Sequence, residues 1–176
     1  GVGFQALLNN TIADNNTAVG YASLYSNVTG TGNTAVGKSS GHDLIGSNNT
    51  IVGSGAGYGG ASATGSSNTI IGVNTGAALT TGSRNIFIGS DGSGVSYASG
   101  YQITTGNNNI IIGNYYGNSG GLDIRTSDGY VVIGSMTDGS RILTTRAGGY
   151  SLALGPSAVP AGGAGVTFPA SQDASS

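Results

Sequence analysis

Few side chains in this sequence could do chemistry, and the acidic ones are the first to consider. All 7 acidic residues are Asp, and the densest group of them is Asp123, Asp128 and Asp138. Hydrolysis of a polysaccharide needs two carboxyl groups roughly 5 to 10 Å apart, so this group is the candidate for such a reaction. Two of the three precede a glycine, and Asp-Gly dipeptides are typical of turns. We therefore expect a structural role and no enzyme activity.

The only histidine, His42, is followed directly by Asp43. A metal site needs three or four ligands, and one histidine per chain would contribute enough of them only if a threefold axis brought three copies together. Acidic residues do not recur at a fixed period, so the calcium-binding β-roll phrase is absent. The sequence predicts no metal and no cofactor.

Tyrosines are the best candidates for binding a ligand. Four of them lie in or directly after the longest stretch between two copies of a repeated phrase: Tyr97, Tyr101, Tyr115 and Tyr116. Long loops on a rigid scaffold commonly carry function, and a tyrosine offers a ring face and a polar tip that suit sugars. We take these four residues as candidate glycan contacts, with packing against coil edges or neighbouring chains as the alternative.

Composition excludes several classes of partner. The chain has 176 residues with 35 Gly, no Cys, 7% charged residues and a formal net charge of −2. Five cationic residues provide no basic surface for a phosphate backbone, which argues against nucleic-acid binding. No apolar run reaches the 18 or more residues that span a bilayer, so we expect no membrane insertion.

A five-residue phrase recurs along the chain and sets its architecture. It begins with Asn, continues with small or β-branched residues and closes with Gly, as in Asn16–Gly20 and Asn33–Gly37. The closing glycines are spaced by 16 to 24 residues. They lie at Gly3, Gly20, Gly37, Gly53, Gly72, Gly89, Gly113, Gly134 and Gly155.

This period predicts an all-β protein, a parallel β-solenoid or β-roll of about eight or nine short coils. It is too short for paired-helix repeats, and the leucine-rich phrase is missing. Each coil would hold one short strand, a glycine corner and a polar return path. A second apolar side lies in several return paths, at Leu24, Leu44, Ile45, Leu79 and Ile103.

The strand phrase has two apolar rows, and it predicts an assembly. Side chains alternate between the two faces of a strand, so the row that contains Ile111 and the row that contains Ile112 face opposite ways. One row fills the coil, and the other forms an exposed apolar stripe that a monomer rarely tolerates. A parallel homotrimer, with chains intertwined or side by side, would cover it. Which row faces the axis stays open.

Polar repeat positions have structural explanations. The Asn that opens six of the phrases predicts an amide ladder between coils. The Asn-x-Thr matches at Asn9, Asn15, Asn27 and Asn48 arise from the repeat, so we do not expect glycans there. A row of Thr begins at Thr17 but is replaced by apolar residues from Ile86 on, which disfavours ice binding.

The chain divides into a repetitive shaft at residues 1–155 and a connector at residues 156–176. Pro156, Pro160 and Pro169 interrupt strand ladders because proline lacks the amide donor. Val166 and Phe168 are the apolar residues that we expect to anchor this segment to the last coil. We expect it to lead toward a domain that this chain lacks.

The phrase Asn-Thr-Ala-Val-Gly, followed by Tyr21–Gly30 (Tyr-Ala-Ser-Leu-Tyr-Ser-Asn-Val-Thr-Gly), resembles the repeats of bacteriophage tail fibre and tailspike proteins. It is also similar to the β-roll head of trimeric autotransporter adhesins. The resemblance covers about residues 1–155 and implies a rigid trimeric fibre segment of a virion, used for host attachment. Its partners would be other tail or fibre proteins and a glycan or protein of the host-cell surface.

Two alternative functions stay open beside a virion tail fibre. One is a bacterial surface adhesin or extracellular filament, which would place the chain at the cell surface or outside the cell. The other is a tailspike that depolymerises polysaccharide. The few carboxylates favour a mechanical role over the enzymatic one.

Overall fold

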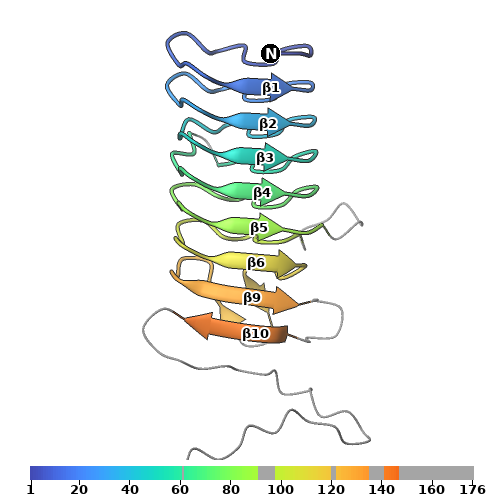
Figure 1. The fold of residues 1–176 in the computed structure, drawn as a ribbon, viewed down its shortest axis with the longest axis vertical. Helices are drawn as coiled ribbons and strands as arrows, with labels where there is room; N and C mark the ends of the chain where they lie inside the picture. The colour runs from blue at the N-terminus through green and yellow to red at the C-terminus, as the bar shows by residue number, and fades with distance from the viewer. Residues whose placement is uncertain (61, 91–97, 120–121, 135–140, 147–176) are drawn as a thin grey trace, which may run out of the picture.

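The computed structural model describes residues 1–60, 62–90, 98–119 and 122–134 in full, and residues 141–146 as backbone. Within these ranges the chain has strands and turns and no helix. Most strands lie one above the next in an elongated stack (Figure 1). The predicted all-β fold of parallel strands arranged as a solenoid is confirmed.

One eight-stranded sheet runs along the stack. Its strands are β1 (Thr17–Val19), β2 (Thr34–Val36), β3 (Thr50–Val52), β4 (Thr69–Ile71), β5 (Ile86–Ile88), β6 (Ile110–Gly113), β9 (Tyr130–Gly134) and β10 (Arg141–Arg146). From β1 to β9 every neighbouring pair is parallel, and equal positions of the repeated phrase pair with one another, as Ala35 does with Ile51. The repeat in the sequence therefore matches the register of the sheet.

The closing glycine of each phrase turns the corner after the strand. At Gly53 the backbone has φ = 136°, and an added Cβ would lie 2.5 Å from the carbonyl oxygen of Gly72 in the next coil. Only glycine combines this conformation with so close an approach of two backbones. This explains why glycine closes the phrase in coil after coil.

The core lies between the strands and their return paths. The central residue of strands β1 to β6 and β9 is buried, and so are apolar residues of the return path, including Leu24, Leu44, Leu79 and Ile103. The prediction that each coil has two apolar sides is confirmed at these positions. A coil this thin can bury side chains only between its strand and its return path.

Where the strand of a coil buries a small side chain the return path buries a large one, and where the strand residue is large the return path is small. In the first coils, small Ala18 and Ala35 lie in the strands and large Leu24 fills the return path. Later, Phe87 takes the strand position, and a Cβ added at Gly100 of the return path would lie 2.7 Å from the Phe87 ring. The sum of the two volumes stays matched to the width of the coil, as close packing requires.

The stack becomes irregular toward its C-terminal end. A small antiparallel pair, β7 (Asn118–Ser119) and β8 (Leu122–Asp123), is inserted into a return path. Strand β10 then pairs antiparallel with β9, with a register shift between Arg141 and Leu143. The parallel ladder thus ends at β9. The phrase that closes at Gly155 and the predicted connector lie outside the described residues, so the total of eight or nine coils stays a prediction.

Candidate functional site

The outward face of the main sheet is the largest regular surface of the chain. Strands β1 to β6 bury their middle residue and expose the residue before the closing glycine. We call the buried row the inner column: Ala18, Ala35, Ile51, Ile70, Phe87, Ile111 and Val132. We call the exposed row the outer column: Val19, Val36, Val52, Ile71, Ile88 and Ile112. The sequence left open which row fills the coil, and the structure assigns that role to the inner column.

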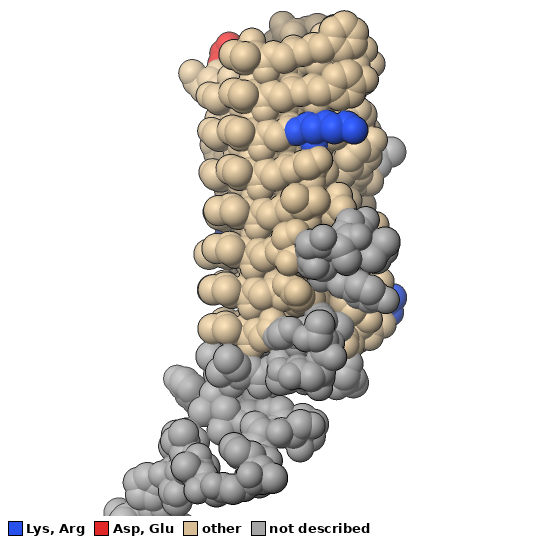
Figure 2. Space-filling view, turned by 90° about the vertical axis from the view of Figure 1, so that its right-hand side faces the viewer, with Lys and Arg blue, Asp and Glu red and all other residues tan. Residues whose placement is uncertain are grey.

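The outer column is uniform along the stack. Its members are between 36% and 41% exposed, and all are Val or Ile. Their neighbours on the same face are Thr in β1 to β4 and Ile in β5 and β6. The face is therefore flat, uncharged and increasingly apolar toward β6. On the side of the molecule shown in Figure 2, few atoms belong to charged residues.

A buried amide ladder runs beside the sheet, as the repeated Asn predicted. The side-chain oxygen of Asn49 accepts hydrogen bonds from the backbone amide and the side-chain amide of Asn68, at 2.9 and 3.0 Å. Asn68 is bonded in the same way by Asn85. The side-chain amides also donate to backbone carbonyls of the next coil, such as that of Gly82. These buried polar groups are satisfied, so their role is structural.

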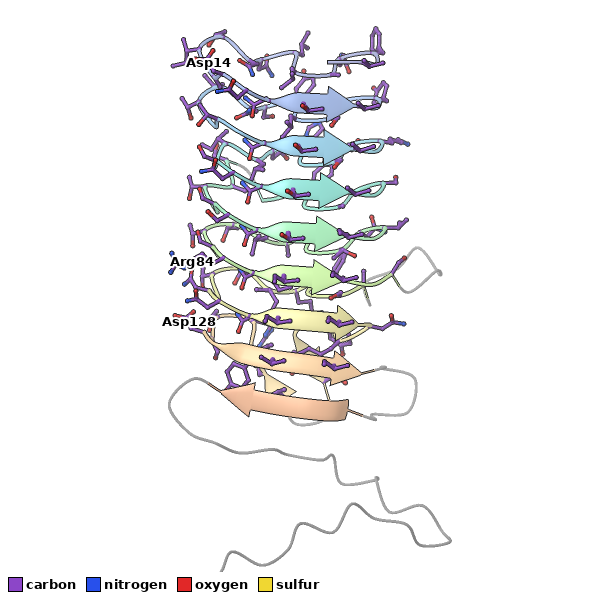
Figure 3. The ribbon with its side chains drawn as sticks, in the orientation of Figure 1. Asp14, Arg84 and Asp128 are labelled. Atoms are coloured by element: carbon purple, nitrogen blue, oxygen red, sulfur yellow. The ribbon has the colours of Figure 1, made fainter. Side chains whose placement is uncertain are left out.

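A second ladder lies at the corner that precedes each strand, and the sequence analysis did not find it. The Ser66 hydroxyl accepts from the backbone amide of Ser47, and Ser83 does the same for Ser66. Farther along, Asn107 and Asp128 take over this position. Figure 3 labels Asp128, Arg84 and Asp14 along this edge of the stack. The available signal was Ser47, Ser66 and Ser83, each two residues before the Asn of a phrase, and it was hidden because Gly, Ser and Asn look interchangeable in loops.

His42 and Asp43 form a pair, but among the described residues they lack the further ligands that a metal site needs. His42 Nδ1 lies 2.8 Å from the Asp43 carboxylate, which also accepts a hydrogen bond from the Ser26 hydroxyl at 2.9 Å. The imidazole is stacked between two tyrosine rings, with centroid distances of 4.9 Å to Tyr25 and 4.8 Å to Tyr58. Among the described residues no three histidine or acidic side chains gather in a way that could hold a metal ion.

The candidate carboxylates are occupied by local partners. Asp123 forms an ion pair with Arg125 at 2.7 Å, and the hydrogen bonds from that side chain lower the pKa of Asp123. A general acid at neutral pH needs the opposite shift. Asp128 accepts from the Asn107 backbone amide at 2.7 Å. Asp138 lies outside the described residues.

The four candidate tyrosines are distributed between core and surface. Tyr115 is only 1% exposed, and its hydroxyl donates to the Leu122 carbonyl at 2.7 Å. Tyr101 and Tyr116 are half-buried on neighbouring coils. Tyr97 lies outside the described residues. The structure thus gives Tyr115 a packing role and leaves Tyr101 and Tyr116 at the surface of the return path.

Comparison of the chain with protein-family models, with curated proteins and with solved structures found no match in any of the three. Among the described residues, no helix is long and apolar enough to cross a membrane.

Proposed function

We propose that this chain is a shaft segment of a phage tail fibre that assembles as a parallel homotrimer and supports attachment to a host cell. The single observation that carries the proposal is the outer column. It extends over six consecutive strands of Val and Ile on a flat, uncharged face, and apolar stripes of this kind mark interaction surfaces.

A parallel arrangement of identical chains suits this face. The outer column runs straight along the stack, so an axis parallel to the stack lets every coil of one chain meet the equivalent coil of its neighbours. Three copies around one axis would bury the column of each chain. The hydrogen bonds between coils stiffen each chain along the same direction, which is what a fibre shaft requires.

The first test is the mass of the assembly in solution. We expect light scattering to give about three times the 17.0 kDa chain mass, and we expect Ile112→Asp to give single chains that keep their β-sheet circular dichroism. Thr50→Asp, on the same sheet face but outside the outer column, is the matched control and should weaken the trimer less. A wild-type monomer or dimer would contradict the trimer.

The second test separates the fibre from its alternatives. Incubation of the purified protein with capsular polysaccharide or lipopolysaccharide should release no oligosaccharide, and electron microscopy should show rods of fixed length. Released product would favour the tailspike depolymerase. Open-ended polymers would favour an extracellular filament.

A further inference from the structure

A column of aromatic rings follows the return paths, on the side of the coil away from the sheet. Tyr25, His42 and Tyr58 lie in three consecutive coils, with ring planes inclined by only 7° and 1°. Each ring fills one coil-to-coil step, since the centroid distances of 4.9 and 4.8 Å match the spacing of neighbouring strands, about 4.8 Å.

Backbone hydrogen bonds show which residues continue this column in the later coils. The backbone amide of Asp43 donates to the Tyr58 carbonyl, and the residue before the donor, His42, stacks on Tyr58. Equivalent bonds run from the amides of Gly59, Ala78 and Gln102 to carbonyls of the next coil. Those carbonyls belong to Ala77, Tyr101 and Tyr116. The backbone register therefore aligns one position of successive coils, which we call the ring column: Tyr25, His42, Tyr58, Ala77, Tyr101 and Tyr116.

Ala77 is the only position of these six without a ring, and it lies between two tyrosines. Tyr58 and Tyr101 are two steps apart, about 9.6 Å along the stack. The preceding residue of the coil faces the core, because a Cβ added at Gly76 would lie 3.1 Å from the Phe87 ring. Ala77 consequently faces outward. Tyr58 is 40% exposed, and Ala77 and Tyr101 are half-buried.

We propose that this interruption, formed by Tyr58, Ala77 and Tyr101, binds one pyranose ring of a neutral glycan. A sugar ring at the Ala77 step would lie one coil from each tyrosine, as His42 lies one coil from Tyr25 and from Tyr58. Its C–H faces would contact the aromatic faces, and the tyrosine hydroxyls can donate to and accept from the sugar hydroxyls. Gln102, next to Tyr101, adds an amide that can donate and accept hydrogen bonds.

The surroundings favour a neutral sugar over a charged ligand or a protein partner. Apart from the two tyrosines and Gln102, the residues beside Ala77 along the chain and in the adjoining coils include Gly59, Gly76 and Ala78, which bring no charge and no large apolar side chain. A stable protein interface needs an apolar core and roughly 800 Å² of surface from each partner. A single sugar ring needs only two ring faces and a few hydrogen bonds.

This inference does not depend on the proposed trimer. The ring column lies on the return paths, whereas the outer column lies on the opposite, sheet side of the coil. Assembly through the sheet face would leave the Ala77 position accessible. The shaft would then contribute to recognition in addition to carrying other parts of a fibre.

The test is a titration of the full chain with hexasaccharides of glucose, galactose and N-acetylglucosamine. Calorimetry and saturation-transfer NMR should show saturable binding of at least one of them, with one site per chain. Ala77→Tyr completes the ring column from within, so it should weaken this binding by about tenfold or more without lowering the melting temperature. Tyr101→Leu should weaken it as well.

Ser54→Tyr is the matched control, because it adds a tyrosine to an exposed position of the return path outside the ring column. This variant should bind as the wild type does. Failure of all three hexasaccharides to bind would overturn the proposal, and so would unchanged binding by Ala77→Tyr. If N-acetyltyrosine amide binds at this position and no sugar does, the occupant is a protein side chain and the assignment to a glycan is wrong.

Discussion

Ile111 and Ile112 are the same side chain at neighbouring positions of one strand, but they meet different surroundings. Ile111, in the inner column, is fully buried, whereas Ile112, in the outer column, is 41% exposed. The same contrast repeats in every parallel strand from β1 to β6. A coil only one strand and one return path thick can bury one face of its strand, so the second apolar face is available for contacts between chains.

The contrast also separates two kinds of stability. Full burial of an Ile or Phe side chain stabilises a fold by about 1.5 to 3 kcal/mol, and the inner column gains this within each chain. The outer column can gain the free energy of full burial only when another chain covers it. Folding of the coil and assembly of chains should therefore respond to different substitutions.

The largest effect is expected for a charge in the inner column. Ile111→Asp removes a fully buried side chain that packs in the core and places a carboxylate there without a partner. We expect a loss of at least about 4 kcal/mol in the free energy of unfolding, measured by urea denaturation followed by circular dichroism. The coils around β6 should lose their structure at 25 °C.

Ile112→Asp is the matched control for this prediction, since it introduces the same charge one residue along. It should keep the circular dichroism of a folded solenoid, because the carboxylate there reaches solvent. Equal loss of structure in both variants would show that the two faces do not differ in the way the structure describes.

The sequence predicted these columns because strand geometry has a period of two and the phrase repeats in register. It could not decide which column is inner, because both columns are apolar along the parallel strands. The decision comes from the return path, where Gly41, Gly57, Gly76 and Gly100 make room for the large residues of the inner column. That match of volumes is a contact between distant positions, and the repeated phrase alone does not contain it.

Two features could not be predicted from the sequence, for related reasons: the antiparallel end of the sheet and the ring column. Strand β10 carries no copy of the phrase, so the period gave no signal for it. The tyrosines at 101 and 116 were predicted as candidates, but their alignment with Tyr25, His42 and Tyr58 depends on return paths of unequal length. Only the backbone hydrogen-bond register shows that these five residues occupy one position of successive coils.

A smaller effect is expected at the amide ladder, the polar counterpart of the inner column. Asn68→Ala removes the side-chain oxygen that accepts from the Asn85 backbone amide and the side-chain amide that donates to the Gly82 carbonyl. An unsatisfied buried group costs about 1 to 3 kcal/mol, so we expect a loss of about 3 kcal/mol in urea denaturation. Thr69→Ala, the adjacent residue on the outward face, should change stability by less than about 0.5 kcal/mol. A similar effect of both substitutions would contradict a structural amide ladder.

The smallest effect concerns the ion pair of Asp123 and Arg125, which belongs to neither column. Both side chains are almost half exposed, at 48% and 47%, so solvent and salt weaken their attraction. The hydrogen bonds from Arg125 hold the pKa of Asp123 below its ordinary value. The folded state therefore binds its proton at lower pH than the unfolded state. The stability that the pair contributes is present above the ordinary pKa of an aspartate and is lost as pH falls through the lowered pKa of Asp123.

We expect the melting temperature of the wild type to fall slightly more between pH 5 and pH 2 than that of Arg125→Gln, with the difference disappearing in about 1 M NaCl. Arg84→Gln is the control, because Arg84 donates to the neutral side chain of Asn108 and its removal should leave the acid sensitivity unchanged. If Arg125→Gln and the wild type show the same acid sensitivity at low salt, the ion pair contributes nothing to the fold, and the stability of this stack comes from its columns alone.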